Sequence, residues 1–190
     1  MEKKNKMETM HMQKLVINMS LPLIVSLLVQ SLYNIVDSIF VAKMSEEALT
    51  ATSLAFPVQM LMIAFSVGTS VGVNALLSKT LGARNRERAT KIANTGIMLA
   101  LISGAVFSLT GIFFAQKLAR SFTTVESTAA LCADYLSICM IFCFGNFIET
   151  MLQRFLQAAG NTVLSMCSLV AGAVTNIILD PILIFGLFGI

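Results

Sequence analysis

The sequence predicts an all-α, polytopic membrane protein, and its composition and its long apolar stretches support this prediction. Apolar residues make up 56% of the 190 residues and charged residues only 12%, whereas soluble domains carry about 25% charged residues. The mean hydropathy is +0.82. Five stretches are long enough to cross a bilayer, which takes about 20 mostly apolar residues. Backbone groups in lipid must be hydrogen-bonded within their own segment, so we expect helices.

The five predicted helices follow a short polar tail, residues 1–14. The first apolar stretch is too long for a cleavable signal peptide and does not end at a small-residue cleavage site, so we expect an uncleaved first span. The second and third stretches contain no charged residue. The transmembrane bundle is predicted over 15–190, with helices at about 15–42, 48–78, 92–115, 127–153 and 162–190.

The basic residues between the stretches predict the orientation of the chain. Ten of the 13 Lys and Arg residues fall in the tail, in the segment 79–91 and at Arg154, which alternate onto one side of the membrane. Only Lys43, Lys117 and Arg120 fall on the other side. Because basic residues collect in cytoplasmic loops, we expect a cytoplasmic N-terminus in a multi-pass protein of the cell membrane.

The sequence contains no pattern typical of an enzyme. The single histidine, His11, lies in the polar tail, and the four cysteines lie in apolar runs without a C-x-x-C pair. P-loop and H-E-x-x-H motifs are absent from the sequence. We therefore expect no catalytic residues and no resident cofactor. The net charge of +3 also argues against a nucleic-acid partner.

Two aspartates stand out because a carboxylate inside a span costs about 2.5–3.5 kcal/mol on insertion scales and marks ion or ligand sites. Asp37 lies about 33 Å along the first predicted helix and Asp180 about 26 Å along the fifth, at 1.5 Å per residue. Both helices run outward, so the two acids fall at comparable depth. Asn34 and Asn176 lie one turn before them on the same helical faces.

Matched Asn/Asp pairs on two parallel helices predict one oxygen-rich site for a cation. Carboxylate and amide oxygens are the ligands that hard cations prefer, and two neighbouring carboxylates also favour the uptake of a proton. We therefore assign Asp37, Asn176, Asp180 and Asn34 to a sodium- or proton-coupling site. The alternative is that the two pairs make unrelated hydrogen bonds between helices.

Other features in the spans have simpler interpretations. Asp134 lies near the outer end of the fourth stretch and is interpreted as interfacial. Glu149 lies near Gln153 and Arg154 at the inner end, where a salt bridge or a snorkelling side chain is expected. The pair Gly68-x-x-x-Gly72 permits close helix packing.

Three stretches of the sequence carry a family resemblance. SLPLIVSLLVQSLYNIVDSIFVA, from Ser20, resembles the first helix of the multidrug and toxic compound extrusion (MATE) family. GTSVGVNALLSKTLGARNRERA, from Gly68, is similar to the second helix and its loop. GNTVLSM from Gly160, followed by GAVTNIILDPILIFG, is similar to the fifth helix. The order of the motifs is kept over nearly the whole chain, and the MepA-like bacterial branch is the closest.

The resemblance implies five helices of a six-helix N-terminal MATE bundle, the incomplete first lobe of a twelve-helix transporter. It implies that Asp37, Asn176 and Asp180 belong to the cation site of that bundle. The sixth helix and the second bundle lie beyond Ile190, so the chain is expected to be an N-terminal fragment whose partner is the C-terminal half.

The leading hypothesis is a cation-coupled antiporter that exports cationic lipophilic drugs and toxic compounds across the membrane. Two alternatives stay open: a flippase for lipid-linked oligosaccharides or peptidoglycan precursors, and a non-transporting membrane subunit. A flippase for a large anionic substrate requires basic residues inside its cavity, and the spans carry none except Lys79 at an end.

Overall fold

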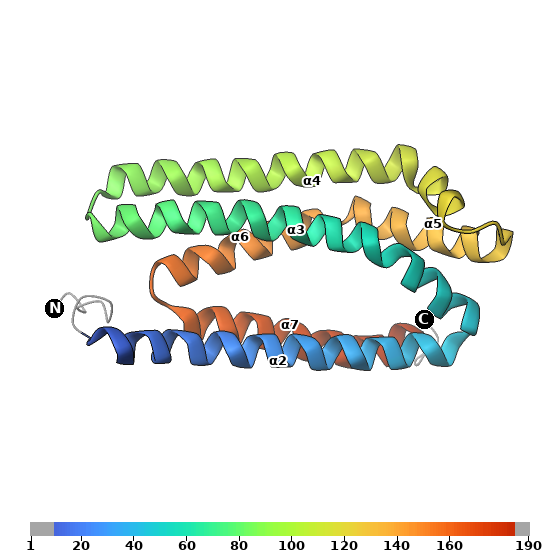
Figure 1. Cartoon of the computed structure of the whole chain (residues 1–190), viewed down its shortest axis with the longest axis horizontal. Coiled ribbons are helices and arrows are strands. Elements are labelled where there is room, and N and C mark those ends of the chain that lie inside the picture. The colour runs from blue at the N-terminus through green and yellow to red at the C-terminus, as the bar shows by residue number, and fades with distance from the viewer. Residues whose placement is uncertain (1–9, 185–190) are drawn as a thin grey trace. The chain divides into compact units, whose positions relative to one another are not determined.

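A computed structural model describes residues 10–184, and within that range every regular element is an α-helix. The predicted all-α fold is therefore confirmed. The predicted tail, 1–14, and the last predicted helix, 162–190, extend beyond the described residues. The helices of Figure 1 are α2 (Met12–Met44), α3 (Glu46–Gly82), α4 (Arg86–Phe122), α5 (Glu126–Ile141), α6 (Phe144–Ala158) and α7 (Thr162–Ile184).

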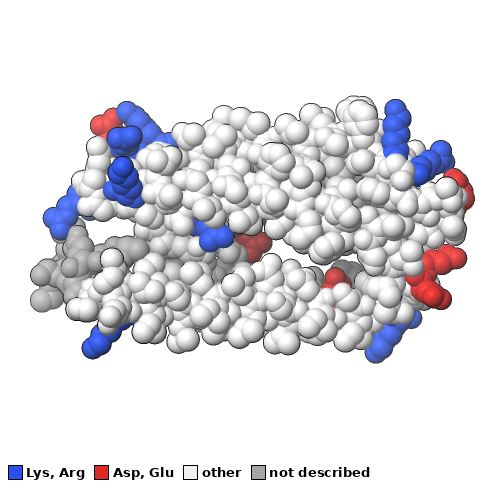
Figure 2. Space-filling view, viewed as in Figure 1, with Lys and Arg blue, Asp and Glu red and all other residues white. Residues whose placement is uncertain are grey.

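Four of these helices, α2, α3, α4 and α7, are each long and apolar enough to cross a membrane. The helices α5 and α6 pass that test only together, and a bend of 45° separates them. The prediction of one continuous helix over 127–153 was therefore wrong. Most of the surface shown in Figure 2 carries no charged side chain, as expected of helices that face lipid.

The bend between α5 and α6 is stabilised by α4. At the break the Cys143 amide donates to the carbonyl of Met140 at 3.4 Å instead of continuing the helical ladder. The Ser108 hydroxyl of α4 donates to the carbonyl of Ile141 at 3.3 Å. A neighbouring helix can thus satisfy a carbonyl that leaves the ladder, which lets a spanning helix break inside a membrane. This tertiary contact is not visible in the local sequence.

The chain divides into two compact units. The first, here called the α2–α7 unit, comprises residues 1–40 and 156–190 and contains most of α2 together with α7. The second, the α3–α6 unit, comprises residues 41–155.

The α3–α6 unit packs through small residues on one face of α4. An added Cβ would meet the Val73 side chain at Gly96, the ring of Phe144 at Gly104 and the Cβ of Met140 at Gly111. Small residues at helical spacing let the backbones of membrane helices approach closely. The buried residues of this face are Ala89, Gly96, Ala100, Gly104, Ser108, Gly111, Ala115 and Ala119.

The glycine pair that the sequence favours for close packing is not used in this way. A Cβ added at Gly68 or Gly72 would meet nothing within 4 Å. The expectation for this pair was wrong within the described residues, because the face of α3 that carries these glycines does not meet a neighbouring helix there. The close contacts lie on α4 instead.

The α2–α7 unit buries few side chains, and several of those are polar. In Figure 1 the two helices run alongside each other. Ser26, 6% exposed, donates from its hydroxyl to the carbonyl of Pro22 at 2.9 Å. The Gln157 amide donates to the hydroxyl of Ser165 at 3.2 Å. Gly160, with a φ of 80°, lies in the turn between α6 and α7.

Candidate functional site

The two predicted aspartates lie in the same unit. Asp37 belongs to the second half of α2 and Asp180 to the last turns of α7, and both residues are half-buried. Both residues belong to the α2–α7 unit. Residues separated by 143 positions in the sequence thus fall in one compact unit.

One carboxylate oxygen at this place is buried without a partner. Oδ2 of Asp180 has no hydrogen-bond partner among the described residues. A buried acceptor that is left unsatisfied costs about 1–3 kcal/mol, and more if it is charged. Pro181 adds to the unmatched oxygens, because it has no N–H to donate to the carbonyl of Ile177 one turn earlier. The local sequence therefore concentrates acceptors where donors are scarce.

The two predicted asparagines lie differently from the aspartates. Asn34 on α2 and Asn176 on α7 are both exposed. The backbone carbonyl of Asn34 accepts a hydrogen bond from the Ser38 hydroxyl at 2.8 Å. The structure thus places both aspartates half-buried in one unit and leaves both amides at the surface of the described chain.

The donor set at this place is made of oxygen atoms. Within residues 10–184 no group of three or more His, Cys, Asp or Glu side chains is arranged to hold a metal ion. The oxygens available are the two carboxylates, with the carbonyl of Ile177 and the asparagine amides near them in sequence. Oxygen ligands suit hard cations, and paired carboxylates also suit a proton.

The other two acids in the spans belong to the α3–α6 unit. Asp134 on α5 is exposed. Glu149 on α6 is also exposed and accepts a hydrogen bond from the Gln153 amide at 3.0 Å. Neither acid has the combination of burial and missing partners that distinguishes Asp180.

A polar contact within the spans was not predicted from the sequence. The side-chain amide of Gln59 on α3 donates to the hydroxyl of Tyr135 on α5 at 2.9 Å and lies 3.9 Å from the sulfur of Cys139. A glutamine in an otherwise uncharged span is the signal that points to such a contact, because its amide needs a partner in lipid.

Three curated proteins are similar to this chain over most of its length. A probable multidrug resistance protein, YoeA of Bacillus subtilis (strain 168), is 31% identical over 88% of this chain and 36% of its own length. A protein named FAD transporter, from Shewanella oneidensis, is 28% identical over 92% of this chain and 38% of its own. The multidrug export protein MepA of Staphylococcus haemolyticus is 27% identical over 92% and 39%. The chain therefore spans less than two fifths of these relatives.

The solved structures agree with these relatives. A crystal structure described as MATE in complex with MaL6 superposes with a TM-score of 0.92 at 29% identity, over 99% of this chain and 42% of the other. The family model described as MatE matches residues 22–182. The matched range includes α3–α6 and both aspartates, so the chain belongs to the MATE family of multidrug efflux transporters.

Proposed function

We propose that the chain forms the N-terminal part of a cation-coupled antiporter that exports cationic lipophilic compounds. The single observation that carries this proposal is the buried oxygen without a partner on Asp180, in the unit that also contains Asp37. Because the chain spans less than two fifths of its curated relatives, transport is proposed for the complete transporter, with a C-terminal half as partner.

In this proposal the two carboxylates bind the coupling ion. Two nearby negative charges in a low-dielectric environment repel each other, and a sodium ion or a proton relieves that repulsion. An ion shifts the conformational equilibrium only by its different affinity for the two states of the transporter. The ion is therefore expected to bind the state that holds the drug weakly. No resident cofactor takes part in this scheme.

The proposed cargo follows from the charge of the helices. Within residues 10–184 the basic side chains lie close to helix ends, such as Lys79 on α3 and Lys117 on α4. A cavity lined by such helices suits a lipophilic cation better than an anion. The relative named FAD transporter favours a second candidate cargo, a large anionic dinucleotide. Export assays with a cationic dye and with FAD on the same vesicles separate the two.

The key experiment replaces each aspartate in the complete transporter. We expect Asp37→Asn and Asp180→Asn each to abolish most of the gradient-driven dye export from proteoliposomes. The double variant should be scarcely worse, because residues that act as a unit cannot be lost twice. Asp134→Asn is the matched control and should be mild. Independent, additive losses would contradict a shared site, and full export by Asp37→Asn would exclude Asp37 from that site.

A binding experiment tests the coupling itself. Reciprocal linkage requires that, if the ion weakens the binding of the drug, the drug weakens the binding of the ion by the same factor. Equilibrium dye titrations with and without sodium, and across pH, should show this effect in the wild type and lose it in Asp37→Asn, while dye binding survives. The sodium and pH arms identify the coupling ion. An unchanged ion effect in the variant would exclude Asp37 as a coupling ligand.

We further propose that the protein lies in the cell membrane with its N-terminus and the α3–α4 turn in the cytoplasm. The support is the excess of basic residues in the tail and around that turn. An Arg86→Cys variant in a background with the four native cysteines replaced should resist a membrane-impermeant thiol reagent in intact cells. Efficient labelling from outside would reverse the orientation.

A further inference from the structure

The turn between α3 and α4 collects basic side chains at the end of two apolar helices. Five basic residues lie within 13 positions there, and all are exposed. The only acid among them is Glu87. We call this set the basic turn: Lys79, Arg84, Arg86, Arg88 and Lys91.

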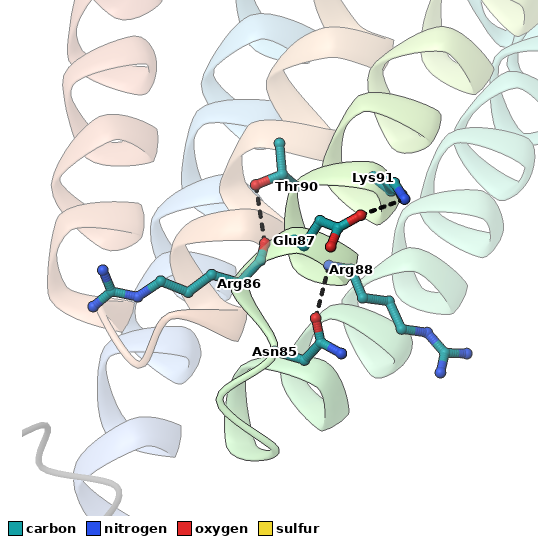
Figure 3. A network of polar contacts seen from close by, with 6 residues as sticks. All are labelled: Asn85, Arg86, Glu87, Arg88, Thr90 and Lys91. Carbon is teal, nitrogen blue, oxygen red and sulfur yellow. Dashed lines mark hydrogen bonds and ion pairs between the residues drawn. The ribbon is translucent and has the colours of Figure 1, made fainter.

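The single acid of the basic turn is already engaged. The Glu87 carboxylate accepts from the Lys91 ammonium at 2.6 Å, one turn along α4. Figure 3 shows Glu87 directed toward Lys91, while the side chains of Arg86 and Arg88 extend to opposite sides. Within residues 10–184 the Arg88 side chain has no hydrogen-bond or ion-pair partner. Within residues 79–91 the turn thus has five basic side chains and one acid.

The backbone of the turn is held in one conformation. The amide of Arg84 donates to the carbonyl of Leu81 at 2.9 Å, and the amide of Asn85 donates to the carbonyl of Thr80 at 3.2 Å. The Asn85 side chain accepts from the amide of Arg88 at 3.0 Å. Arg84 adopts a φ of 57°, which is uncommon for a residue other than glycine. The arginines are thus presented from a fixed loop, which lowers the entropy lost on binding.

The opposite ends of α3 and α4 carry no excess of positive charge. The segments that join α2 to α3 and α4 to α5 carry three basic and three acidic side chains, and one pair, Arg120 and Glu126, is in contact at 3.0 Å. These six residues are Lys43, Glu46, Glu47, Lys117, Arg120 and Glu126. This difference in charge between the two ends of α3 and α4 lies within the α3–α6 unit.

We propose that the basic turn is a binding surface for the headgroups of anionic phospholipids. The apolar stretch of α3 ends at about Leu81 and that of α4 begins at about Ile92. The turn between them therefore lies at the level of the headgroups. Guanidinium groups bind phosphate oxygens through paired hydrogen bonds. Basic clusters immediately beside a spanning helix attract anionic lipids. This interaction is independent of the ion site proposed above.

A fluorescence experiment on the full chain tests the proposal. The sequence contains no Trp, so a Leu81→Trp variant in vesicles has one reporter, next to the turn on a partly exposed position. Quenching is compared between mixtures in which either phosphatidylglycerol or phosphatidylcholine carries brominated chains. We expect phosphatidylglycerol to be preferred about fivefold, the attraction expected for roughly one basic residue at the surface. The preference should fall as the salt concentration rises.

Matched variants make the result specific to the turn. A Phe122→Trp reporter at the opposite end of α4 should show a preference near one. Arg86→Gln with Arg88→Gln should abolish the preference at the Leu81→Trp reporter, and Arg86→Lys with Arg88→Lys should keep most of it. Thermal unfolding of each variant, expected to match the wild type because both arginines are exposed, confirms that the fold is intact.

Three outcomes would overturn the proposal. The first is a preference near one with both arginines present. The second is an equal preference at the two reporters, or one that survives the double glutamine substitution. The third is loss of the preference on adding inorganic phosphate at matched ionic strength, which would make the turn a site for free phosphate instead of lipid.

Discussion

The α3–α6 unit and the α2–α7 unit differ in the amount of apolar side chain that they bury. The buried clusters of the α3–α6 unit are made of Ala, Cys, Leu, Met, Val and Phe. In the α2–α7 unit the buried side chains include Ser26, Thr162 and Ser165, and an oxygen of Asp180 is buried without a partner. Among the described residues each unit has one buried side-chain oxygen without a partner, but in the α3–α6 unit it is the hydroxyl of Ser66, whereas in the α2–α7 unit it belongs to a carboxylate.

We interpret the α3–α6 unit as a packing scaffold and the α2–α7 unit as the part that contains the candidate site. Close packing through small residues holds membrane helices together, because lipid supplies no hydrophobic driving force between them. Buried polar groups in a span are expensive and are kept for function. We therefore expect substitutions in the α3–α6 unit to act on stability, and substitutions near the two aspartates to act on transport.

The largest effect is expected at Asp180. Asp180→Asn should lower export by the complete transporter by at least about tenfold, within the usual range of coupling between sites. Thermal stability should stay the same or rise, because a carboxylate with an unpartnered buried oxygen is removed. Parallel measurement of export and thermal unfolding checks both expectations. If thermal stability fell enough to account for the loss of export, the proposed contrast between the two units would be refuted.

The next effect is expected at Gly111 on α4. Gly111→Ala places a Cβ against the Cβ of Met140, and such overpacking costs about 1–3 kcal/mol. Gly72→Ala is the matched control, since its Cβ meets nothing within 4 Å. Helix propensity favours Ala over Gly by about 1 kcal/mol, so the control should be neutral or stabilising. Equal thermal midpoints for the two variants would refute the packing assignment.

A smaller effect is expected at the bend between α5 and α6. Ser108→Ala removes the hydroxyl that donates to the carbonyl of Ile141, and such contacts between membrane helices average about 0.6 kcal/mol. Ser121→Ala, which removes a hydroxyl bonded within its own helix to Leu118, should cost less. Thermal unfolding of the pair tests whether α4 stabilises the bend; a reversed order would show that it does not.

The smallest effect is expected at the ion pair between Glu87 and Lys91. Both side chains are mostly exposed, at 80% and 73%, so solvent screens the pair and Glu87→Gln should cost at most about 0.5 kcal/mol. The same substitution adds to the net positive charge of the basic turn and should raise its preference for anionic lipid. A large loss of stability would show that the pair holds the turn in place.

Local sequence was sufficient for the helices and for the identity of the two aspartates. Uninterrupted apolar stretches such as 92–115 must be helical in lipid, because no other open segment satisfies its own backbone. Asp37 and Asp180 could be selected because charge is rare in the spans. The exposure of Asn34 and Asn176 could not be predicted, since a shared helical face does not say which neighbour that face meets.

By itself, the sequence determined that the chain has helices long and apolar enough to cross a membrane, and which acids lie inside them. The tertiary structure alone decided that the fourth span breaks at Phe142–Cys143, that Gly96, Gly104 and Gly111 make the close contacts instead of Gly68 and Gly72, and that Asp37 and Asp180 fall in one unit. The physical reason is that apolar length and charge are properties of a segment. Which carbonyl is bonded at a break, where a Cβ would clash and which acids share a unit all depend on which helices become neighbours.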